Sequence, residues 1–247
     1  MSQTVARAIE ILEYVSTTPR TQTEVAKHLG VHRSTALRLL ETLTTSGLVR
    51  RWDNGRYGVG YRLAGLAALA LEQFDLAKIT RPHLQELCEI STHTVHLAVL
   101  ERDRIVYADK VEPPRSIRLY SQIGQPVCFH TAGVSKAILA YQPENRVRSM
   151  LAGHEFERHT DTTITDLEEF VAQLRTTRDN GFAVDDGEFE DYVNCIAMPI
   201  RDATGEVLAA VSVTALKARA DLESLTRLLP DLGRAVTTIS KELGWRQ

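Results

Sequence analysis

Arginine and hydroxyl side chains gather in two short stretches near the start of the sequence. Arg33 and Arg38 are separated by a segment that contains Ser34 and Thr35. Arginine can pair bidentately with guanine, and hydroxyl groups can bond to phosphates or base edges. Such side chains at the start of a helix predict a recognition helix for the major groove, although solvated arginines on a small helical domain would look similar. The predicted DNA contacts are Thr23, His32, Arg33, Ser34, Thr35, Arg38, Arg50, Arg51 and Arg56.

A second group of polar side chains lies near the end of the sequence. Ser212 and Thr214 are two residues apart, so on a strand they share one face. Both hydroxyls could donate to a carboxylate in a cavity, with Cys195 as part of its wall. Gly133 could expose backbone amides at the start of a helix, where anions are favoured. An ordinary half-buried sheet with Cys195 as a small core residue is the open alternative.

The histidines provide weaker candidates for a metal site. His93 and His96 are three residues apart in a predicted strand, so they face opposite sides and cannot hold one ion together. His154 and His159 lie on a predicted loop, where a zinc site stays possible if further ligands join them. We therefore expect no metal and no cofactor.

Cys195, His130 and Asp185 include the residue types of a thiol nucleophile, its base and an orienting acid. The sequence shows no sign of an oxyanion hole or of a helix start that would activate Cys195. We therefore do not expect an enzyme.

The elements that must position the arginines form a compact pattern. Thr21 and Glu24 have the spacing of a capping box that starts a helix, and Gly30 stands where that helix should end. Asn54 and Gly55 separate two β-prone runs, which is a strong hairpin signal. Helices at residues 4–17, 21–29 and 33–46, followed by this hairpin, predict a winged helix-turn-helix over residues 1–62. A linker helix is expected over residues 63–75.

The rest of the sequence, residues 76–247, predicts a second domain. Helical spacing alternates with β-prone runs joined by short turns, which predicts an α+β domain on an antiparallel sheet. Helices are predicted at residues 76–90, 132–141, 144–151, 166–179 and 221–243, and strands at 94–100, 104–111, 116–120, 195–200 and 206–214.

Composition and charge narrow the class of protein. The chain is 43% hydrophobic, enough for a core, and its N-terminus shows no signal peptide or long apolar span. Three cysteines without metal spacing fit a reducing cytoplasm, where we expect the protein to reside. Residues 1–62 hold nine Lys and Arg against five Asp and Glu, whereas the remainder holds twenty against twenty-seven. This asymmetry favours a polyanion as the partner of the first domain.

Ten short blocks, in this order and spacing, carry a resemblance to a known family. They lie at residues 7–12, 23–26, 31–40, 47–49 and 57–60, and at 124–126, 130–132, 136–140, 180–186 and 195–200. Over essentially its whole length the sequence resembles the IclR family of bacterial transcription regulators. It departs from the family pattern at Ser135, where glycine is usual, and at residues 191–193, where a glycine-containing turn is usual.

The resemblance implies a winged-helix domain, a dimerising linker helix and a GAF-like effector domain. It also implies a homodimer or a dimer of dimers on operator DNA, and a repressor or activator of a catabolic operon. The effector is expected to be a small organic acid. Candidate effector contacts are Leu119, Cys128, Gly133, Val134, Asp185, Cys195, Ser212 and Thr214.

Overall fold

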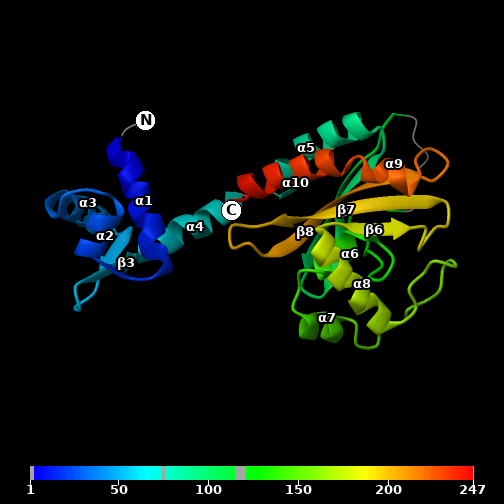
Figure 1. The fold of residues 1–247 in the computed structure, drawn as a ribbon, viewed down its shortest axis with the longest axis horizontal. Coiled ribbons are helices and arrows are strands. Elements are labelled where there is room, and N and C mark those ends of the chain that lie inside the picture. The colour runs from blue at the N-terminus through cyan, green and yellow to red at the C-terminus, as the bar shows by residue number, and fades with distance from the viewer. Residues whose placement is uncertain (1–2, 74–75, 115–120, 247) are drawn as a thin grey trace. The chain divides into compact units, whose positions relative to one another are not determined.

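The computed structural model describes residues 3–73, 76–114 and 121–246 of the 247-residue chain (Figure 1). The chain forms two compact units, Met1–Asp75 and Leu76–Gln247. The strand predicted at residues 116–120 lies outside the described residues. Among the described residues, every helix is too short or too polar to cross a membrane.

The first unit contains helices and a small sheet. The β2–β3 hairpin lies where the Asn-Gly signal predicts it, and β1, which the sequence analysis did not predict, pairs with β3 to complete a sheet of order β1-β3-β2. The elements are α1 (Gln3–Thr17), β1 (Arg20–Thr21), α2 (Gln22–His28), α3 (Arg33–Thr45), β2 (Val49–Arg51), β3 (Arg56–Val59) and α4 (Tyr61–Gln73).

Local signals fix the helix-turn-helix. The capping box at the start of α2 is formed in both directions, because the Thr21 side chain accepts from the Glu24 amide and the Glu24 carboxylate accepts from the Thr21 amide. Gly30 follows α2 with φ of 62°, a left-handed conformation that glycine adopts without strain. The helices then bury one apolar core against the hairpin, which comprises Ile11, Val15, Val25, Ala26, Ala36, Leu40, Leu43, Val49 and Tyr57.

The second unit is an α+β domain on a five-stranded antiparallel sheet of order β5-β4-β8-β7-β6. Its elements are α5 (Leu76–Ser91), β4 (Thr94–Glu101), β5 (Arg104–Val111), α6 (Gly133–Leu139), α7 (Glu144–Met150), α8 (Leu167–Asn180), β6 (Ala183–Asp186), β7 (Val193–Arg201), β8 (Val207–Leu216), α9 (Leu222–Thr226) and α10 (Leu229–Glu242).

Two parts of this unit differ from the sequence prediction. The single helix predicted at residues 221–243 is two helices, α9 and α10, because Pro230 in the first turn of α10 cannot continue a preceding helix. The edge strand β6 was not predicted, since its four residues are too few for a clear alternation and include two aspartates.

Helices cover both faces of the sheet, with α5 and α10 on one side and α6 and α8 on the other (Figure 1). Side chains of β8 alternate between these layers. Val211 and Val213 pack with the α5 and α10 core, whereas Ala210 packs with the α6 core. Ser212 and Thr214 therefore face the α6 side, which is where the sheet offers polar groups.

Candidate nucleic-acid interface and effector cavity

The predicted recognition helix α3 divides into a buried and an exposed side. Ala36 and Leu40 are fully buried, whereas Arg33, Ser34 and Arg38 are exposed. Thr35 is partly buried, and Thr23 is exposed in the first turn of α2. This arrangement leaves the start of α3 available to a ligand outside the domain.

His32 has a structural role at the start of α3. Its Nδ1 lies 3.3 Å from the Ser34 amide, from which it accepts, and 2.8 Å from the Ser34 hydroxyl. The imidazole thus caps the helix and fixes the conformation of the turn that precedes it. The ring remains exposed, so it can still lie against a partner.

The hairpin arginines do not share one environment. Arg50 and Arg51 are exposed on β2, with their guanidinium carbons 5.7 Å from the ring centres of Trp52 and Tyr57. Arg56 instead donates to the Pro19 carbonyl at 2.9 Å and lies 3.6 Å from the Glu24 carboxylate. It therefore ties the hairpin to the start of α2.

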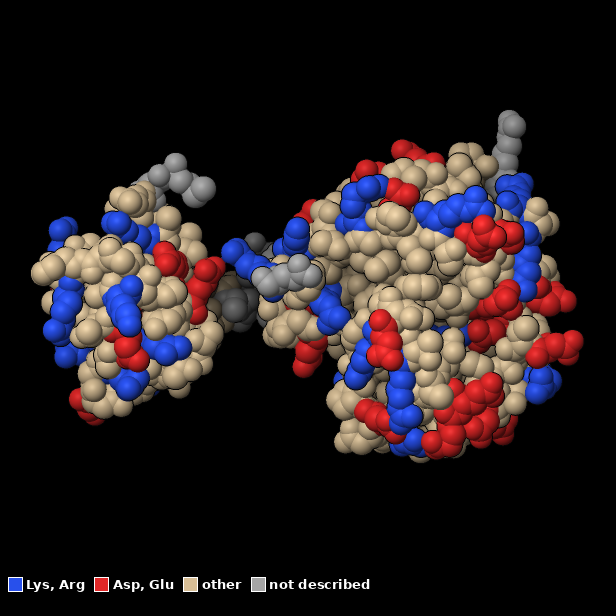
Figure 2. Space-filling model, in the orientation of Figure 1, with Lys and Arg blue, Asp and Glu red and all other residues tan. Residues whose placement is uncertain are grey.

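Basic side chains gather along the edge of the first unit that α3 forms, on the left in Figure 2. Acidic side chains are sparse on this edge. Part of the charge excess that the composition indicates for residues 1–62 is therefore displayed on this edge.

The second unit contains a cavity of about 310 Å³ between the sheet and the start of α6. Its floor consists of two neighbouring cross-strand rows. Thr214, Cys195 and Asp185 pair across β8, β7 and β6, and His96 pairs with Ser212 across β4 and β8. The antiparallel register therefore brings together residues that are up to 118 positions apart.

His96 is a neutral hydrogen-bonding group in the cavity wall. Burial lowers its pKa to about 3, and the charge of Lys110 adds to this effect. The ring bonds the Ser121 hydroxyl through Nε2 at 2.7 Å, while Nδ1 lies 3.4 Å from Ser212 Oγ and 3.3 Å from Thr214 Oγ1. Because Nδ1 can share one proton only, one of these two hydroxyls stays available to a ligand.

Ionisable groups beside the cavity are buried, and burial shifts their pKa values. Burial raises the pKa of Asp185 to about 6, although the charge of Lys136 opposes this. Burial likewise raises the pKa of Glu188 to about 7. Lys136 is fully buried, pairs with Glu188 and donates to the Val184 carbonyl at 2.8 Å. The lysine side chain of α6 thus anchors this helix to the sheet edge.

Gly133 is required by the close packing of α6 on the sheet. A Cβ atom at this position would lie 2.9 Å from Cys195 Sγ, closer than real side chains approach. The start of α6 can therefore lie directly over Cys195, which closes one side of the cavity.

The structure separates the three residues of the possible thiol nucleophile set. His130 bonds to Cys128, His154 and the Glu157 carbonyl, and it is not a lining residue of the cavity that holds Cys195 and Asp185. Burial raises the pKa of Cys195 to about 12, so the thiol stays protonated. This geometry does not support nucleophilic catalysis by Cys195.

The structure brings seven of the eight predicted effector contacts to the same cavity. Leu119 lies outside the described residues. Sequence reasoning missed His96 as a lining group and Tyr107 beside it, because it treated His96 only as a metal candidate. The period-two pattern of its strand could have placed His96 on the cavity face. The seven lining residues are Cys128, Gly133, Val134, Asp185, Cys195, Ser212 and Thr214.

Two models of known protein families together match most of the chain. Residues 4–52 match the IclR helix-turn-helix domain, and residues 68–241 match the C-terminal domain of the bacterial transcriptional regulator IclR. The transcriptional regulator KdgR of Escherichia coli is 31% identical over 90% of this chain and 85% of its own length. The acetate operon repressor of Salmonella typhimurium is 29% identical over 98% of this chain and 88% of its own.

A solved structure supports the same assignment. The IclR protein of Thermotoga maritima matches with a TM-score of 0.66 and 29% identity, over 99% of this chain and all of that one. Its likeness extends across both units. This chain therefore belongs to the IclR family of bacterial transcriptional regulators, which bind DNA and respond to a small-molecule effector and are not enzymes.

Proposed function

We propose that this regulator binds its operator as a homodimer, through α3 and the β2–β3 hairpin, and that a small carboxylic acid in the cavity of the second unit controls this binding. The observation that carries the proposal is the convergence of the Ser212, Thr214 and Tyr107 hydroxyls on one largely apolar cavity, whose lining also includes the carboxyl groups of Asp185 and Glu190. Such a site suits a small ligand with one polar end. The bacterial cytoplasm, where operator DNA lies, is the expected location.

The DNA contacts follow from exposure. Arg33, Ser34 and Arg38 face away from the core at the start of α3, the part of a recognition helix that reaches base edges. Arg50 and Arg51 on the hairpin are suited to the phosphate backbone. Thr23, His32 and Thr35 complete this surface, whereas Arg56 holds the hairpin in position.

Exposed apolar side chains support the homodimer. Val5 and Ile9 on α1 are 58% and 49% exposed, and Tyr61 on α4 is 84% exposed. Leu66 and Leu69 on α4 are exposed as well. A second copy of the chain would bury them, and pairing copies through the linker helix would carry two recognition helices to successive major grooves, about 34 Å apart.

The carboxylate end of the effector is proposed from the chemistry of the cavity. His96 Nδ1 can engage only one of the hydroxyls of Ser212 and Thr214, so the other is an uncharged donor for the ligand. Burial also raises the pKa of Tyr107, so its hydroxyl stays protonated. Uncharged donors in a site of low polarity stabilise an anion through short hydrogen bonds. The acetate operon repressor, a relative of this chain, is named for an operon of a carboxylic acid.

Gating requires that the effector bind more tightly to one arrangement of the dimer than to another. We propose that the filled cavity shifts the linker helix α4 and so changes the distance between the two recognition helices. The regulator would then lose or gain register with the two half-sites of its operator.

Calorimetric titration with paired ligands tests the effector proposal. A panel of aromatic and sugar acids is compared with the corresponding amides, which share shape but lack the charge. We expect at least one acid to bind and its amide to bind more weakly. The double variant Ser212→Ala, Thr214→Val should make the binding free energy of the acid less favourable by about 1–3 kcal/mol.

The matched control is Ser149→Ala, which removes an exposed hydroxyl on α7 and should change nothing. Equal affinities of acid and amide, or undiminished affinity in the double variant, would show that the carboxylate is bound elsewhere or is not recognised.

A further inference from the structure

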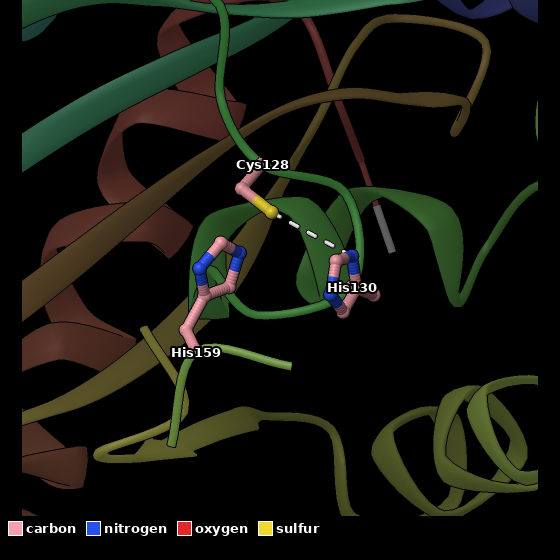
Figure 3. A group of neighbouring side chains, drawn as sticks. All are labelled: Cys128, His130 and His159. Carbon is pink, nitrogen blue, oxygen red and sulfur yellow. Dashed lines mark hydrogen bonds between the residues drawn. The ribbon is translucent and has the colours of Figure 1, made fainter. Parts of the chain in front are cut away.

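A cluster of sulfur and imidazole groups lies beside the effector cavity. Figure 3 shows Cys128 and His130, from the segment before α6, together with His159 from the loop that precedes α8. One ligand atom from each of these residues lies within 4.8 Å of the other two. Loop segments about thirty residues apart thus present three metal-binding side chains to one point.

The distances suit a tetrahedral ion. Cys128 Sγ lies 3.6 Å from His130 Nδ1. With a Zn–S bond of about 2.3 Å and a Zn–N bond of about 2.05 Å, tetrahedral coordination places sulfur and nitrogen about 3.6 Å apart. Little movement is therefore needed for an ion to lie between these two atoms.

The tautomer of His130 is the one that a metal requires. Its Nε2 lies 3.0 Å from the Glu157 carbonyl, which can only accept, so Nε2 carries the proton. The lone pair is then on Nδ1, the atom that faces Cys128. A ligating histidine commonly donates its other N–H to a backbone carbonyl, which fixes the ring and strengthens the ligand.

The loop that carries His159 is held in place by threonines. Thr160 and Thr162 donate to the Gly187 carbonyl at 2.7 and 2.9 Å, and Thr163 donates to the Glu188 carbonyl at 2.7 Å. The His159 amide in turn donates to the Thr163 hydroxyl at 3.1 Å. The third donor is therefore positioned by the β6–β7 connection before any ion binds.

We propose that Cys128, His130 and His159 bind a zinc ion beside the effector cavity. Thiolate and imidazole ligands select zinc over magnesium or calcium, which prefer oxygen. Three protein ligands leave one position of the tetrahedron open, as in zinc sites that bind a further molecule. Because Cys128 also lines the cavity, the ion would be bound through a side chain of the cavity wall.

His154 competes with the ion for His130 Nδ1 and must release this atom when the ion binds. Its Nε2 lies 2.9 Å from His130 Nδ1, so in the metal-free chain it donates to the lone pair that the ion would take. A hydrogen-bonded group of packed histidines is the alternative explanation for the cluster, with His159 lying against Phe189 at 4.6 Å between ring centres.

Metal titration of the full-length chain without a polyhistidine tag distinguishes the two explanations. Metal-free protein competes with a chromophoric chelator for Zn²⁺, and Co²⁺ serves as a spectroscopic probe. We expect about one equivalent of tightly bound zinc, a tetrahedral Co²⁺ spectrum with a thiolate charge-transfer band, and a higher Tm in the presence of zinc.

Two variants locate the ion. Cys128→Ser should remove the charge-transfer band, and His159→Ala should weaken zinc binding by more than about tenfold. His159 is exposed, so its replacement should leave the Tm of the metal-free protein unchanged. Cys88→Ser and His93→Ala, which alter the same residue types around a different cavity, should bind zinc as the wild type does. Failure of the wild type to bind zinc, or unchanged binding by both site variants, would overturn the proposal.

Discussion

The arginines at the start of α3 in the first unit lie in solvent, whereas the charged groups Lys136 and Asp185 beside the cavity of the second unit are buried. Arg33 and Arg38 project from α3 and contribute little to its core. Lys136 is fully buried and Asp185 is only 8% exposed. An exposed charge can be changed at the cost of binding alone, whereas a buried charge must be satisfied for the fold to persist. The difference predicts that affinity and stability can be altered separately in the first unit but are coupled in the second.

The largest expected effect is that of Lys136→Met. The substitution leaves Glu188 buried without its cation, which should lower the free energy of unfolding by about 3–5 kcal/mol near pH 8. Because burial already raises the pKa of Glu188 to about 7, this carboxyl should become neutral in acid and the loss should shrink. Urea denaturation of the full chain near pH 8 and again in acid measures this loss of stability.

Lys217→Met is the matched control for this lysine. Its ammonium lies 2.9 Å from Asp186, but the side chain is 35% exposed, so its loss should cost less than about 1 kcal/mol. Equal losses in the two variants would mean that burial does not distinguish these ion pairs.

The next effect is a pH dependence that Asp185→Asn should remove. Burial raises the pKa of Asp185 from 3.8 to about 6, with Lys136 and Lys217 opposing and Asp186 adding to the rise. The folded chain therefore binds this proton more tightly than the unfolded chain, so the wild type loses stability as the pH rises between these values. Relative to the wild type, the variant should gain up to about 3 kcal/mol between pH 4 and pH 8.

Denaturation curves of both proteins across this pH range measure the gain. The difference between the two proteins includes the effect on Glu188, because the charge of Asp185 contributes to the raised pKa of Glu188 and is absent in the variant. A difference that stays constant with pH would show that Asp185 titrates as an ordinary exposed carboxyl.

In the first unit the expected effect is on binding. Arg38→Ala should weaken binding to the operator by about 1–3 kcal/mol and leave the Tm unchanged, because the side chain is exposed. Gel-shift or anisotropy titrations measure the affinity, with Arg104→Ala as an exposed arginine of the other unit. A drop in Tm alongside the loss of affinity would show that stability and binding are coupled in the first unit as well. Unchanged affinity would show that Arg38 does not contact the operator.

The smallest expected effect concerns the hairpin. Arg50→Ala and Arg51→Ala should each lower the slope of log K against log salt concentration by about 1, because each loses one phosphate contact. Preference among operator sequences should stay the same, since phosphate contacts carry no base information. Arg56→Ala, by contrast, should lower Tm through the lost contacts to Pro19 and Glu24. An unchanged salt slope in both variants would place the hairpin away from the DNA.

Much of the first unit could be predicted from the sequence because its signals are local. The capping box at Thr21 and Glu24, the turn at Gly30 and the hairpin at Asn54 each depend on residues that are neighbours in the chain. The structural role of Arg56 could not be predicted from such local signals, since its partner Pro19 lies 37 residues earlier in the chain.

In the second unit the alternation of Ser212 and Thr214 indicated a shared face, but not what lies opposite it. The partner of Lys136 was equally hidden, although a lysine in the apolar run of α6 signals that a buried anion must exist somewhere. The break between α9 and α10 was missed because the amphipathic pattern continues across Pro230.

By itself the sequence determined the approximate bounds of most helices and which of their faces are apolar, since backbone preferences and side-chain spacing act over a few residues. Tertiary structure alone decided that Asp185, Cys195 and Thr214 form one row, and that His159 lies beside Cys128 and His130. Strand register and loop docking depend on burying side chains that are far apart in the chain. No local pattern encodes that outcome, because it is the packing of the whole unit that selects it.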